Sequence, residues 1–169
     1  VVPGVASSPT STLIEVGKGA ATFLQDAIRD GDTVAISGGK TLSVMIENMT
    51  TPTEYDVEVV PMNGGVQGQH YTDVNHIATQ LADKLSGKAH LLHAPLHADS
   101  PSERDLVMSV KSVSEVMNAA RAANIAVVGI GAVVGADSTY YMAHPVSEGE
   151  RSRLYETGVR SEFLGYLVQ

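Results

Sequence analysis

The sequence lacks cysteine and tryptophan, and none of its apolar runs approaches the roughly 18 residues that a membrane span requires. Without cysteine, the chain can form neither a disulfide framework nor a thiolate nucleophile. We find no secretory signal peptide, and we therefore expect a cytoplasmic location. These absences argue against a disulfide-stabilised secreted domain, a thiol enzyme and a membrane-spanning protein.

Aromatic side chains and positive charge are also scarce. Phe, Trp and Tyr make up 5% of the residues, which gives no evident stacking platform for bases or planar cofactors. The net charge of −8 opposes direct binding to a nucleic-acid backbone, which favours a basic surface. A local basic pocket for an anionic small molecule is compatible with this acidity. Any contact with DNA is therefore expected outside this segment.

The length and composition predict one globular domain. With 169 residues, of which 43% are hydrophobic, the chain can bury one sizeable core. It begins with Val-Val-Pro rather than Met, which we interpret as an excised piece of a longer protein. We predict a linker or irregular lead-in over residues 1–12 and an α/β domain over residues 13–169. Because the sequence stops on an apolar run typical of a strand, we expect this domain to be incomplete at its C-terminal end.

The strongest local pattern lies in residues 32–49, DTVAISGGKTLSVMIENM. A short β-branched and apolar run reaches two glycines, and apolar residues then recur at the spacing of one helix face. The first N–H groups of such a helix lack internal partners, and the aligned peptide dipoles place partial positive charge there. Because Lys40 adds a full positive charge and Thr41 a hydroxyl, this loop is a candidate phosphate site.

The loop does not match the P-loop of nucleoside-triphosphate-binding proteins. That motif requires a glycine five positions before its Gly-Lys pair, a place that Val34 occupies here. Short glycine motifs are also weak evidence by themselves. The alternative is that Gly38 and Gly39 only make a tight turn while Lys40 is solvated.

The combination of strand, glycine and helix occurs at three places, Gly38-Gly39, Gly64-Gly65 and Gly129-Ile130-Gly131. Runs that are apolar on both faces and alternate with helices indicate a mostly parallel, Rossmann-like α/β sheet with helices on both faces. The carboxyl ends of parallel strands reach one edge, where ligands of open α/β sheets bind. We therefore expect the three glycine loops to meet there around an anion.

Hydrophobic periodicity places the other elements of this fold. Helices are predicted over residues 13–28, 74–85, 113–120 and 147–157, with a further helix starting at the capping-box sequence of residues 100–103. Strands are predicted over residues 57–62, 90–92, 125–130 and 162–169. A turn is expected over residues 50–53 and a polar loop over residues 66–71.

Histidines and serines do not predict a metal site or a hydrolase. His90 and His93 would point to opposite faces of a strand, and Pro95 prevents the helix that could align them with His97. No Gly-x-Ser-x-Gly sequence occurs, so the nucleophile elbow of serine hydrolases is absent. We predict neither a metal ligand set nor a catalytic serine.

The sequence predicts no dinucleotide cofactor. It does offer two carboxylates as candidate sugar-binding groups. After Gly129-Ile130-Gly131, the third glycine of the dinucleotide fingerprint would fall at Val134. Asp73 and Glu162 lie in segments that could reach the binding edge. Carboxylates hydrogen-bond sugar hydroxyls well, although most acidic side chains on such a surface are only solvated.

Several motifs follow one another along the chain: DGDTVAISGGKTLSVMIENM, VEVVPMNGG, an Asn75-x-Ile77 helix start, HLLHAPLHADSPSERD, IAVVGIGAV and GVRSEFLGYLV. Their order resembles the effector domain of SorC-type sugar-binding transcriptional regulators, and the similarity covers nearly all of residues 16–169. It implies a fold related to ribose-5-phosphate isomerase and glucosamine-6-phosphate deaminase, without their catalysis. It also implies an N-terminal helix-turn-helix that binds operator DNA.

The resemblance also implies a set of effector-binding residues. A phosphate would be held by Gly38, Gly39, Lys40, Thr41 and Leu42, and a sugar would be lined by Asn63, Gly64, Gly65, Gly129, Gly131 and Glu162. Asp73 is a further sugar-binding candidate from its position in the chain alone. Asn63 stands where related sequences can carry a basic residue. Because an amide can neither neutralise a second phosphate nor form an imine, we expect a singly phosphorylated, noncovalent ligand. Arg160 and Ser161 stand where the family usually has small residues before the acidic residue, here Glu162. The family's later segment, whose Ala-Gly-Gly and lysine often complete the pocket, is missing from this sequence.

We therefore predict an effector-sensing domain of a DNA-binding regulator of carbohydrate metabolism, without a cofactor and not an enzyme. Its expected partners are a phosphorylated sugar, operator DNA through another domain, and further copies of the chain. The alternative is a sugar-phosphate isomerase or deaminase, which needs a general base; Asp73, His70 and Glu162 are candidates, but no motif fixes any of them. A pure oligomerisation module, with glycines serving turns only, is the third possibility.

Overall fold

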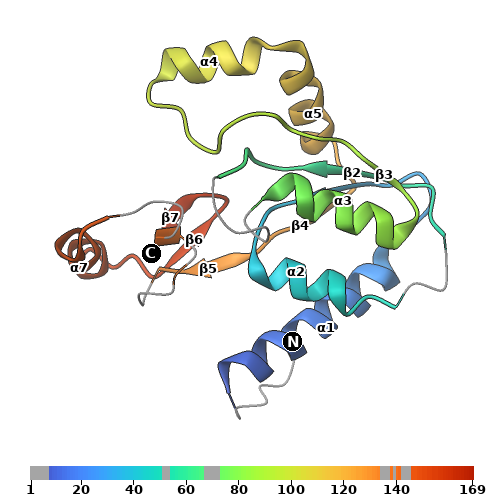
Figure 1. Cartoon of the computed structure of the whole chain (residues 1–169), viewed down its shortest axis with the longest axis horizontal. Helices are drawn as coiled ribbons and strands as arrows, with labels where there is room; N and C mark the ends of the chain where they lie inside the picture. Colours follow the sequence, from blue (N-terminus) through green and yellow to red (C-terminus); the bar gives the residue numbers. More distant parts are fainter. Residues whose placement is uncertain (1–7, 51–53, 67–72, 134–137, 139, 142–145) are drawn as a thin grey trace.

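The computed structural model describes residues 8–50, 54–66, 73–133, 138, 140–141 and 146–169 (Figure 1). The turn expected over residues 50–53 and the polar loop expected over residues 66–71, with His70, lie largely outside the described residues. Among the described residues, no helix combines the length and the apolar character needed to cross a membrane.

A parallel sheet of four short strands lies at the centre of the fold. Strand β1 (Thr33–Ile36) pairs with β2 (Glu58–Pro61) on one side and with β4 (Ile125–Val127) on the other, and β3 (Lys88–Ala89) lies beyond β2. Helices pack on both faces of this sheet. The predicted fold class, a parallel α/β sheet flanked by helices, is confirmed.

The main core lies between this sheet and three helices, α1 (Pro9–Ala27), α2 (Lys40–Glu47) and α3 (Val74–Leu85). Val34, Ile36 and Val59 point into it. Their neighbours Ala35 and Val60 are also fully buried but point to the opposite face, where α5 (Lys111–Arg121) contacts β1 and β2. Burial on both faces explains why these strands read as continuous apolar runs.

Helix α1 begins earlier than predicted. The Ser8 side chain accepts a hydrogen bond from the Ser11 N–H (3.1 Å), and Pro9 occupies the start of the helix, so residues 9–12 are helical rather than part of a linker. Serine at the cap and proline in the first turn are both favourable there, although the same residues are also typical of a loop. Gly17 lets α1 approach α2, because a Cβ at this position would lie 2.7 Å from Val44 Cγ1.

The predicted third strand, residues 90–92, is wrong in position. The strand is Lys88–Ala89, immediately after Gly87, where a Cβ would lie 2.6 Å from the Val57 carbonyl oxygen. The His90 N–H still donates to the Val59 carbonyl of β2 (2.8 Å). Leu92 is held differently: the Asn75 side-chain amide accepts from the Leu92 N–H (2.8 Å) and donates to the Leu92 carbonyl (3.0 Å). The Asn75 side chain thus takes the place of a neighbouring strand as the hydrogen-bond partner of the Leu92 backbone. Hydrophobic periodicity cannot reveal such a partner.

The predicted strands over residues 125–130 and 162–169 are each divided. Only Ile125–Val127 forms β4, while β5 (Ile130–Ala132) joins β6 (Ser161–Phe163) and β7 (Tyr166–Val168) in a separate antiparallel sheet. Positive φ angles at Leu164 (52°) and Gly165 (85°) turn β6 into β7. These turns separate short strands that look continuous in the sequence.

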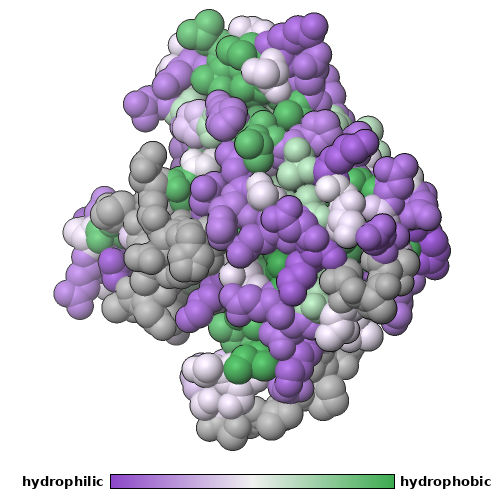
Figure 2. All heavy atoms as spheres, turned by 45° about the vertical axis from the view of Figure 1, so that its right-hand side comes forward, coloured by the Kyte–Doolittle hydropathy of each residue, from purple (hydrophilic) through white to green (hydrophobic). Residues whose placement is uncertain are grey.

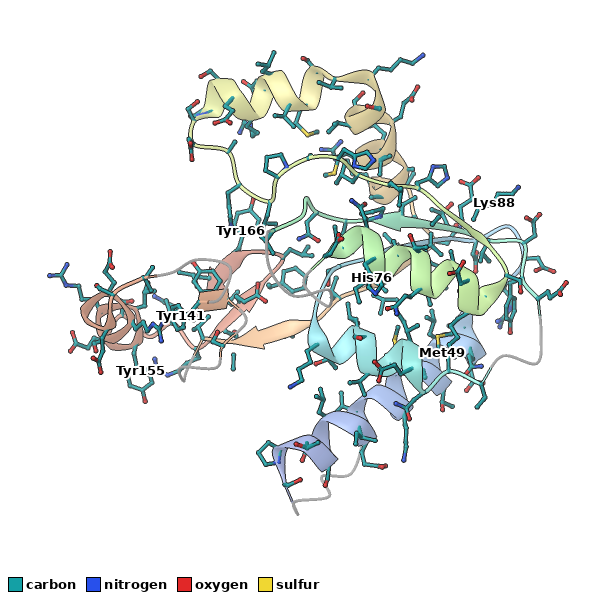
Figure 3. The ribbon with its side chains drawn as sticks, viewed as in Figure 1. Met49, His76, Lys88, Tyr141, Tyr155 and Tyr166 are labelled. Atoms are coloured by element: carbon teal, nitrogen blue, oxygen red, sulfur yellow. The ribbon has the colours of Figure 1, made fainter. Side chains whose placement is uncertain are left out.

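A smaller core stabilises the antiparallel sheet. It contains Val133, Tyr141 and Val159, next to helix α7 (Glu148–Glu156), whose cap is a complete capping box between Ser147 and Glu150. Tyr141 lies between α7 and the strands (Figure 3), and the Arg151 guanidinium carbon lies 4.5 Å from its ring centroid.

The hairpin of α4 (Pro101–Ser109) and α5 lies on the face of the parallel sheet that α5 contacts (Figure 1). As predicted, Ser100 caps α4, accepting the Glu103 N–H (3.2 Å), but the Glu103 carboxylate accepts from the Asp99 N–H (2.8 Å) rather than from Ser100. No side chain of α4 is buried, and Leu106 and Val110 are exposed. The space-filling view shows hydrophobic surface near the top of the molecule (Figure 2). The hairpin has its own small core, with Leu92, Val113 and Val116.

Candidate functional site

The loop between β1 and α2 presents unused backbone donors. Gly39 is the N-cap of α2 and has φ 141°, a conformation that favours glycine, and its carbonyl accepts from the N–H groups of Leu42 and Ser43 (3.1 Å each). The N–H groups of Gly39, Lys40 and Thr41 donate to no acceptor among the described residues. The Lys40 side chain is exposed and forms no ion pair with any residue that the structure describes. Three donors, the helix dipole and one ammonium group therefore converge at this helix start.

A second glycine corner packs against this loop. The Ser37 hydroxyl accepts from the Gly129 N–H (3.2 Å), and a Cβ on Gly129 would lie 3.9 Å from the Gly38 carbonyl oxygen. Gly38 follows β1 and Gly129 follows β4, and these strands are neighbours although they are far apart in sequence. The strand order, β3-β2-β1-β4, changes direction between β1 and β4. The two corners thus meet at the topological switch point, where open α/β sheets bind ligands.

Glu162 supplies a carboxylate at the same place. It pairs with Gly131 across β5 and β6, and a Cβ on Gly131 would lie 2.5 Å from Glu162 Oε1. Only a glycine leaves room for this carboxylate, whose other oxygen, Oε2, accepts from the Gly165 N–H (3.0 Å). Burial, together with the neighbouring Tyr141 and Glu162 side chains, raises the pKa of the Tyr140 phenol above its ordinary value.

These groups line one cavity of about 300 Å³. Its walls include Gly38–Thr41 from the first corner, Gly129–Ala132 from the second, and the side chains of Leu13, Ser138 and Glu162. We call it the switch-point cavity. It can hold an anion against the α2 N–H groups and offers a carboxylate oxygen for a hydroxyl nearby.

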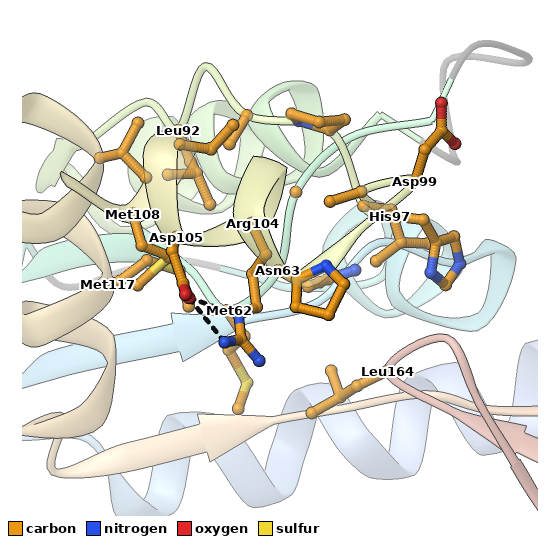
Figure 4. Close-up of a pocket in the computed structure, with 18 of the residues that line it drawn as sticks. Met62, Asn63, Leu92, His97, Asp99, Arg104, Asp105, Met108, Met117 and Leu164 are labelled. Atoms are coloured by element: carbon orange, nitrogen blue, oxygen red, sulfur yellow. Dashed lines mark hydrogen bonds and ion pairs between the residues drawn. The ribbon is translucent and has the colours of Figure 1, made fainter. Parts of the chain in front are cut away.

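The third glycine corner lies elsewhere. Asn63 and Gly64 line a larger cavity of about 790 Å³, under the α4–α5 hairpin (Figure 4), that shares no lining residue with the switch-point cavity. A Cβ on Gly64 would lie 2.1 Å from the Pro95 carbonyl oxygen, and Gly65 forms an isolated parallel bridge with Pro95. The glycines of this corner allow two chain segments to pack closely. We expected all three glycine corners to meet at one cavity, and this is wrong for Gly64-Gly65. Only Gly38-Gly39 and Gly129-Ile130-Gly131 share a cavity.

Residues 1–169 match the model of the family Sugar-bind, described as "Putative sugar-binding domain". The chain belongs to this family. This Sugar-bind domain is 29% identical over 171 residues to the transcriptional regulator LsrR of Klebsiella pneumoniae, a match that covers 100% of the chain and 50% of that regulator. It is 24% identical over 156 residues to the erythritol catabolism regulatory protein EryD of Brucella abortus, covering 91% of the chain and 49% of that protein.

A solved structure has the same fold. The full-length sorbitol operon regulator SorC from Klebsiella pneumoniae matches with a TM-score of 0.85 and 23% sequence identity, over 99% of this chain and 55% of that one. The Sugar-bind domain therefore spans about half the length of LsrR, EryD and SorC.

Two residues that were predicted to bind the effector, Leu42 and Asp73, have structural partners in the Sugar-bind domain. Leu42 is 3% exposed in the main core, and its N–H is bonded to the Gly39 carbonyl. Asp73 caps α3, where its carboxylate accepts from the Asn75 N–H (3.0 Å), and it lines neither cavity. The phosphate and sugar assignments of the remaining residues stay predictions.

The sequence did not reveal the positions of Ser37 and Ser138 at the cavity, nor that the two predicted helices α4 and α5 border the larger cavity. Ser37 is buried at 4% exposure and joins the two glycine corners, and Ser138 donates to the Ala132 carbonyl (2.7 Å) at the cavity wall. A serine that directly follows a buried strand was the available signal for Ser37. Among the described residues, no three His, Asp or Glu side chains group as metal ligands, and His90 lies 3.3 Å from the Glu58 carboxylate.

Proposed function

We propose that the chain is the effector-sensing domain of a regulator of carbohydrate metabolism, and that the switch-point cavity binds a phosphorylated sugar or a related metabolite. The observation that carries the proposal is the convergence of the unused N–H groups of Gly39, Lys40 and Thr41 with the Lys40 ammonium. Gly38 to Thr41 would hold the phosphate, because an anion satisfies these donors and the helix dipole together.

The opposite wall suits the uncharged part of such a ligand. Gly129 and Gly131 let a sugar approach the backbone closely, and Glu162 Oε1 can accept from a hydroxyl while Oε2 is held by Gly165. The cavity, about 300 Å³, is at the lower end of the range for small-molecule sites. One phosphate and a small sugar fit this size and this number of cationic groups.

Regulation would follow from coupling between sites. The relatives LsrR and EryD are regulators, and this chain corresponds to about half of each, so operator DNA would be bound by a domain outside this chain. An effector shifts operator affinity only if it binds one conformational or oligomeric state more tightly than another. We propose a homo-oligomer whose states differ in this way.

The first prediction tests the phosphate seat. A six-carbon sugar monophosphate such as glucosamine 6-phosphate, added well above its Kd, should raise the melting temperature of the domain; binding at about 100 times Kd stabilises the folded state by about 2.7 kcal/mol. Lys40→Ala should remove most of this rise, because it deletes the only cationic side chain among the lining residues of the cavity that the structure describes.

Lys111→Ala is the matched control, since Lys111 is exposed at the start of α5, outside the cavity. It should leave the thermal shift unchanged. If Lys40→Ala retains the full shift, or if no sugar phosphate or inorganic phosphate gives one, the proposed function is wrong.

The enzyme alternative has a separate test. The described residues of the cavity offer Glu162 as a carboxylate, but it is already fixed by the Gly165 N–H, and no histidine lines the cavity there. Sugar phosphates incubated with the protein and followed by NMR should therefore stay unchanged. Turnover that a Glu162→Gln variant loses would establish an isomerase or deaminase instead.

A further inference from the structure

Ser37 lies at the end of β1, directly before the candidate phosphate loop. Its N–H donates to the Val127 carbonyl of β4 (3.1 Å), and the residue is 4% exposed. The sheet therefore fixes the backbone of Ser37, and its side chain lies between the two glycine corners of the switch-point cavity. Ser37 does not itself line this cavity, so it can affect a ligand there only through its neighbours.

The Ser37 hydroxyl bonds to both glycine corners at once. It donates to the Gly38 carbonyl (3.1 Å) and accepts from the Gly129 N–H (3.2 Å). A carbonyl can only accept and an amide N–H can only donate, so the partner atoms alone assign both bonds. Because a hydroxyl has a single proton to donate, that proton is committed to Gly38. The side chain of Ser37 thus sets the direction of the Gly38 carbonyl.

The direction of the Gly38 carbonyl determines where the Gly39 N–H points. The peptide bond between these residues is planar and trans, which places its C=O and its N–H on opposite sides. The hydrogen bond from Ser37 therefore turns the Gly39 N–H away from the Ser37 hydroxyl. In this orientation the N–H has no acceptor among the described residues and remains available to a ligand.

Two consecutive glycines make the opposite orientation of this peptide accessible. Rotating the peptide by about 180° takes φ of Gly39 from 141° to a negative value, and neither glycine has a Cβ that opposes the change. After the rotation a carbonyl oxygen points where the N–H pointed, and this oxygen repels an anion. The hydrogen bond from Ser37 favours the orientation that attracts one.

We propose that Ser37 is a positioning residue for the anion site. Its hydroxyl holds the Gly38–Gly39 peptide in the orientation that presents the Gly39 N–H to a phosphate. The same oxygen holds the Gly129 corner beside the phosphate loop, so one side chain arranges both walls of the cavity. This role deepens the proposed function and rests on it. It explains why a hydroxyl follows Val34–Ile36, which are fully buried and apolar.

Ser37→Ala removes the hydroxyl, and inorganic phosphate is the probe. In ¹H–¹⁵N NMR spectra of the 169-residue chain, phosphate should shift the amide signals of Gly39, Lys40 and Thr41 saturably. In the variant the Gly39 signal should no longer respond, and the Kd reported by the other two amides should rise about tenfold or more, as expected for one hydrogen bond to a charged group. A residue that only stabilised the strand would change the three responses equally or not at all.

Two further variants separate positioning from stability. Ser37→Thr keeps a hydroxyl and should restore the Gly39 response. Val34→Ala is the matched control, since Val34 is fully buried in the same strand and does not line the cavity. It should lower the melting temperature of the chain and leave the phosphate Kd unchanged.

Glucosamine 6-phosphate tests the bond to the second corner. This ligand would reach both glycine corners of the proposed site, whereas inorganic phosphate would contact only the loop before α2. Ser37→Ala should therefore weaken glucosamine 6-phosphate by a further three- to tenfold in isothermal titration calorimetry, the factor expected for one neutral hydrogen bond.

Two results would overturn the positioning role while the proposed function stands. One is a Gly39 amide in Ser37→Ala that shifts with phosphate as in the wild type; the other is a Ser37→Thr variant that melts like the wild type but binds as weakly as Ser37→Ala. A wild-type chain in which neither ligand shifts any of the three amides, or full affinity in Lys40→Ala, would refute the proposed function and the positioning role together.

Discussion

Single residues explain why three similar glycine motifs have different roles. Gly39 is required by its backbone, with φ 141°, whereas Gly131 makes room for the Glu162 carboxylate and Gly64 makes room for the Pro95 backbone. Gly39 supports a set of free N–H groups, Gly131 makes room for a carboxylate at the cavity wall, and Gly64 allows a contact between chain segments. The same residue type thus shapes the switch-point cavity in two places and allows packing in the third.

Gly131→Ala should weaken sugar-phosphate binding with little loss of stability. The new Cβ would lie 2.5 Å from Glu162 Oε1, and the flexible carboxylate can move away, so the melting temperature should fall only slightly. The displaced carboxylate loses its hydrogen bond to the ligand, a loss worth about 1.5–3 kcal/mol for a charged group, or about tenfold or more in Kd. Isothermal titration calorimetry measures the effect.

Gly149→Ala provides the comparison, since its Cβ would meet nothing within 4 Å on α7. It should leave the Kd unchanged. An unchanged Kd for Gly131→Ala as well would remove Glu162 from the proposed site.

At the scale of elements, local capping and long-range bonding differ in how well sequence reveals them. The helix start at Ser100 was predicted because its capping sequence is local, and this serine caps α4 in the structure. The segment after β3 has no such signal, since Asn75 holds the Leu92 backbone across 17 positions. An asparagine near a helix start looks like any other polar residue until the chain is folded.

Asn75→Ala should destabilise the domain by about 2 kcal/mol or more. It leaves both the N–H and the carbonyl of the buried Leu92 without partners, and each unsatisfied group costs about 1–3 kcal/mol. Urea unfolding followed by circular dichroism measures the change. Gln80→Ala on the same helix, which breaks no side-chain bond among those described, should change stability by less than about 0.5 kcal/mol, and equal effects of the two variants would contradict the bridging role.

For the whole molecule, the decisive feature is the junction of two sheets. The parallel sheet supplies the loops after β1 and β4, and the antiparallel sheet supplies Glu162 opposite them. Each sheet has its own core, so the switch-point cavity lies where two separately packed units meet. A ligand that bridges such a junction can favour one relative arrangement of the units, as a sensor requires.

Hydrogen exchange followed by mass spectrometry should reveal this organisation. Amides of β1 and β2, buried on both faces, should exchange most slowly, whereas those of α4 and α7, which bury no side chain, should exchange faster. Glucosamine 6-phosphate should slow exchange in residues 38–41 and in residues 129–132 together. Protection of the first segment alone would contradict a ligand that bridges the two corners, and Lys40→Ala should show neither effect.

The sequence by itself determined the class of fold, the position of the first glycine loop and the helix cap at Ser100, because periodicity, glycine and capping residues act within a few positions of one another. It also carried the motif order that placed the chain in its family. Only the tertiary structure decided that Gly38-Gly39 and Gly129-Ile130-Gly131 share a cavity while Gly64 lines another, and that the apolar runs at residues 125–130 and 162–169 break into short strands. Those outcomes depend on which strands become neighbours and on close approaches such as Gly64 to Pro95 and Gly131 to Glu162, which are set by packing between segments distant along the chain.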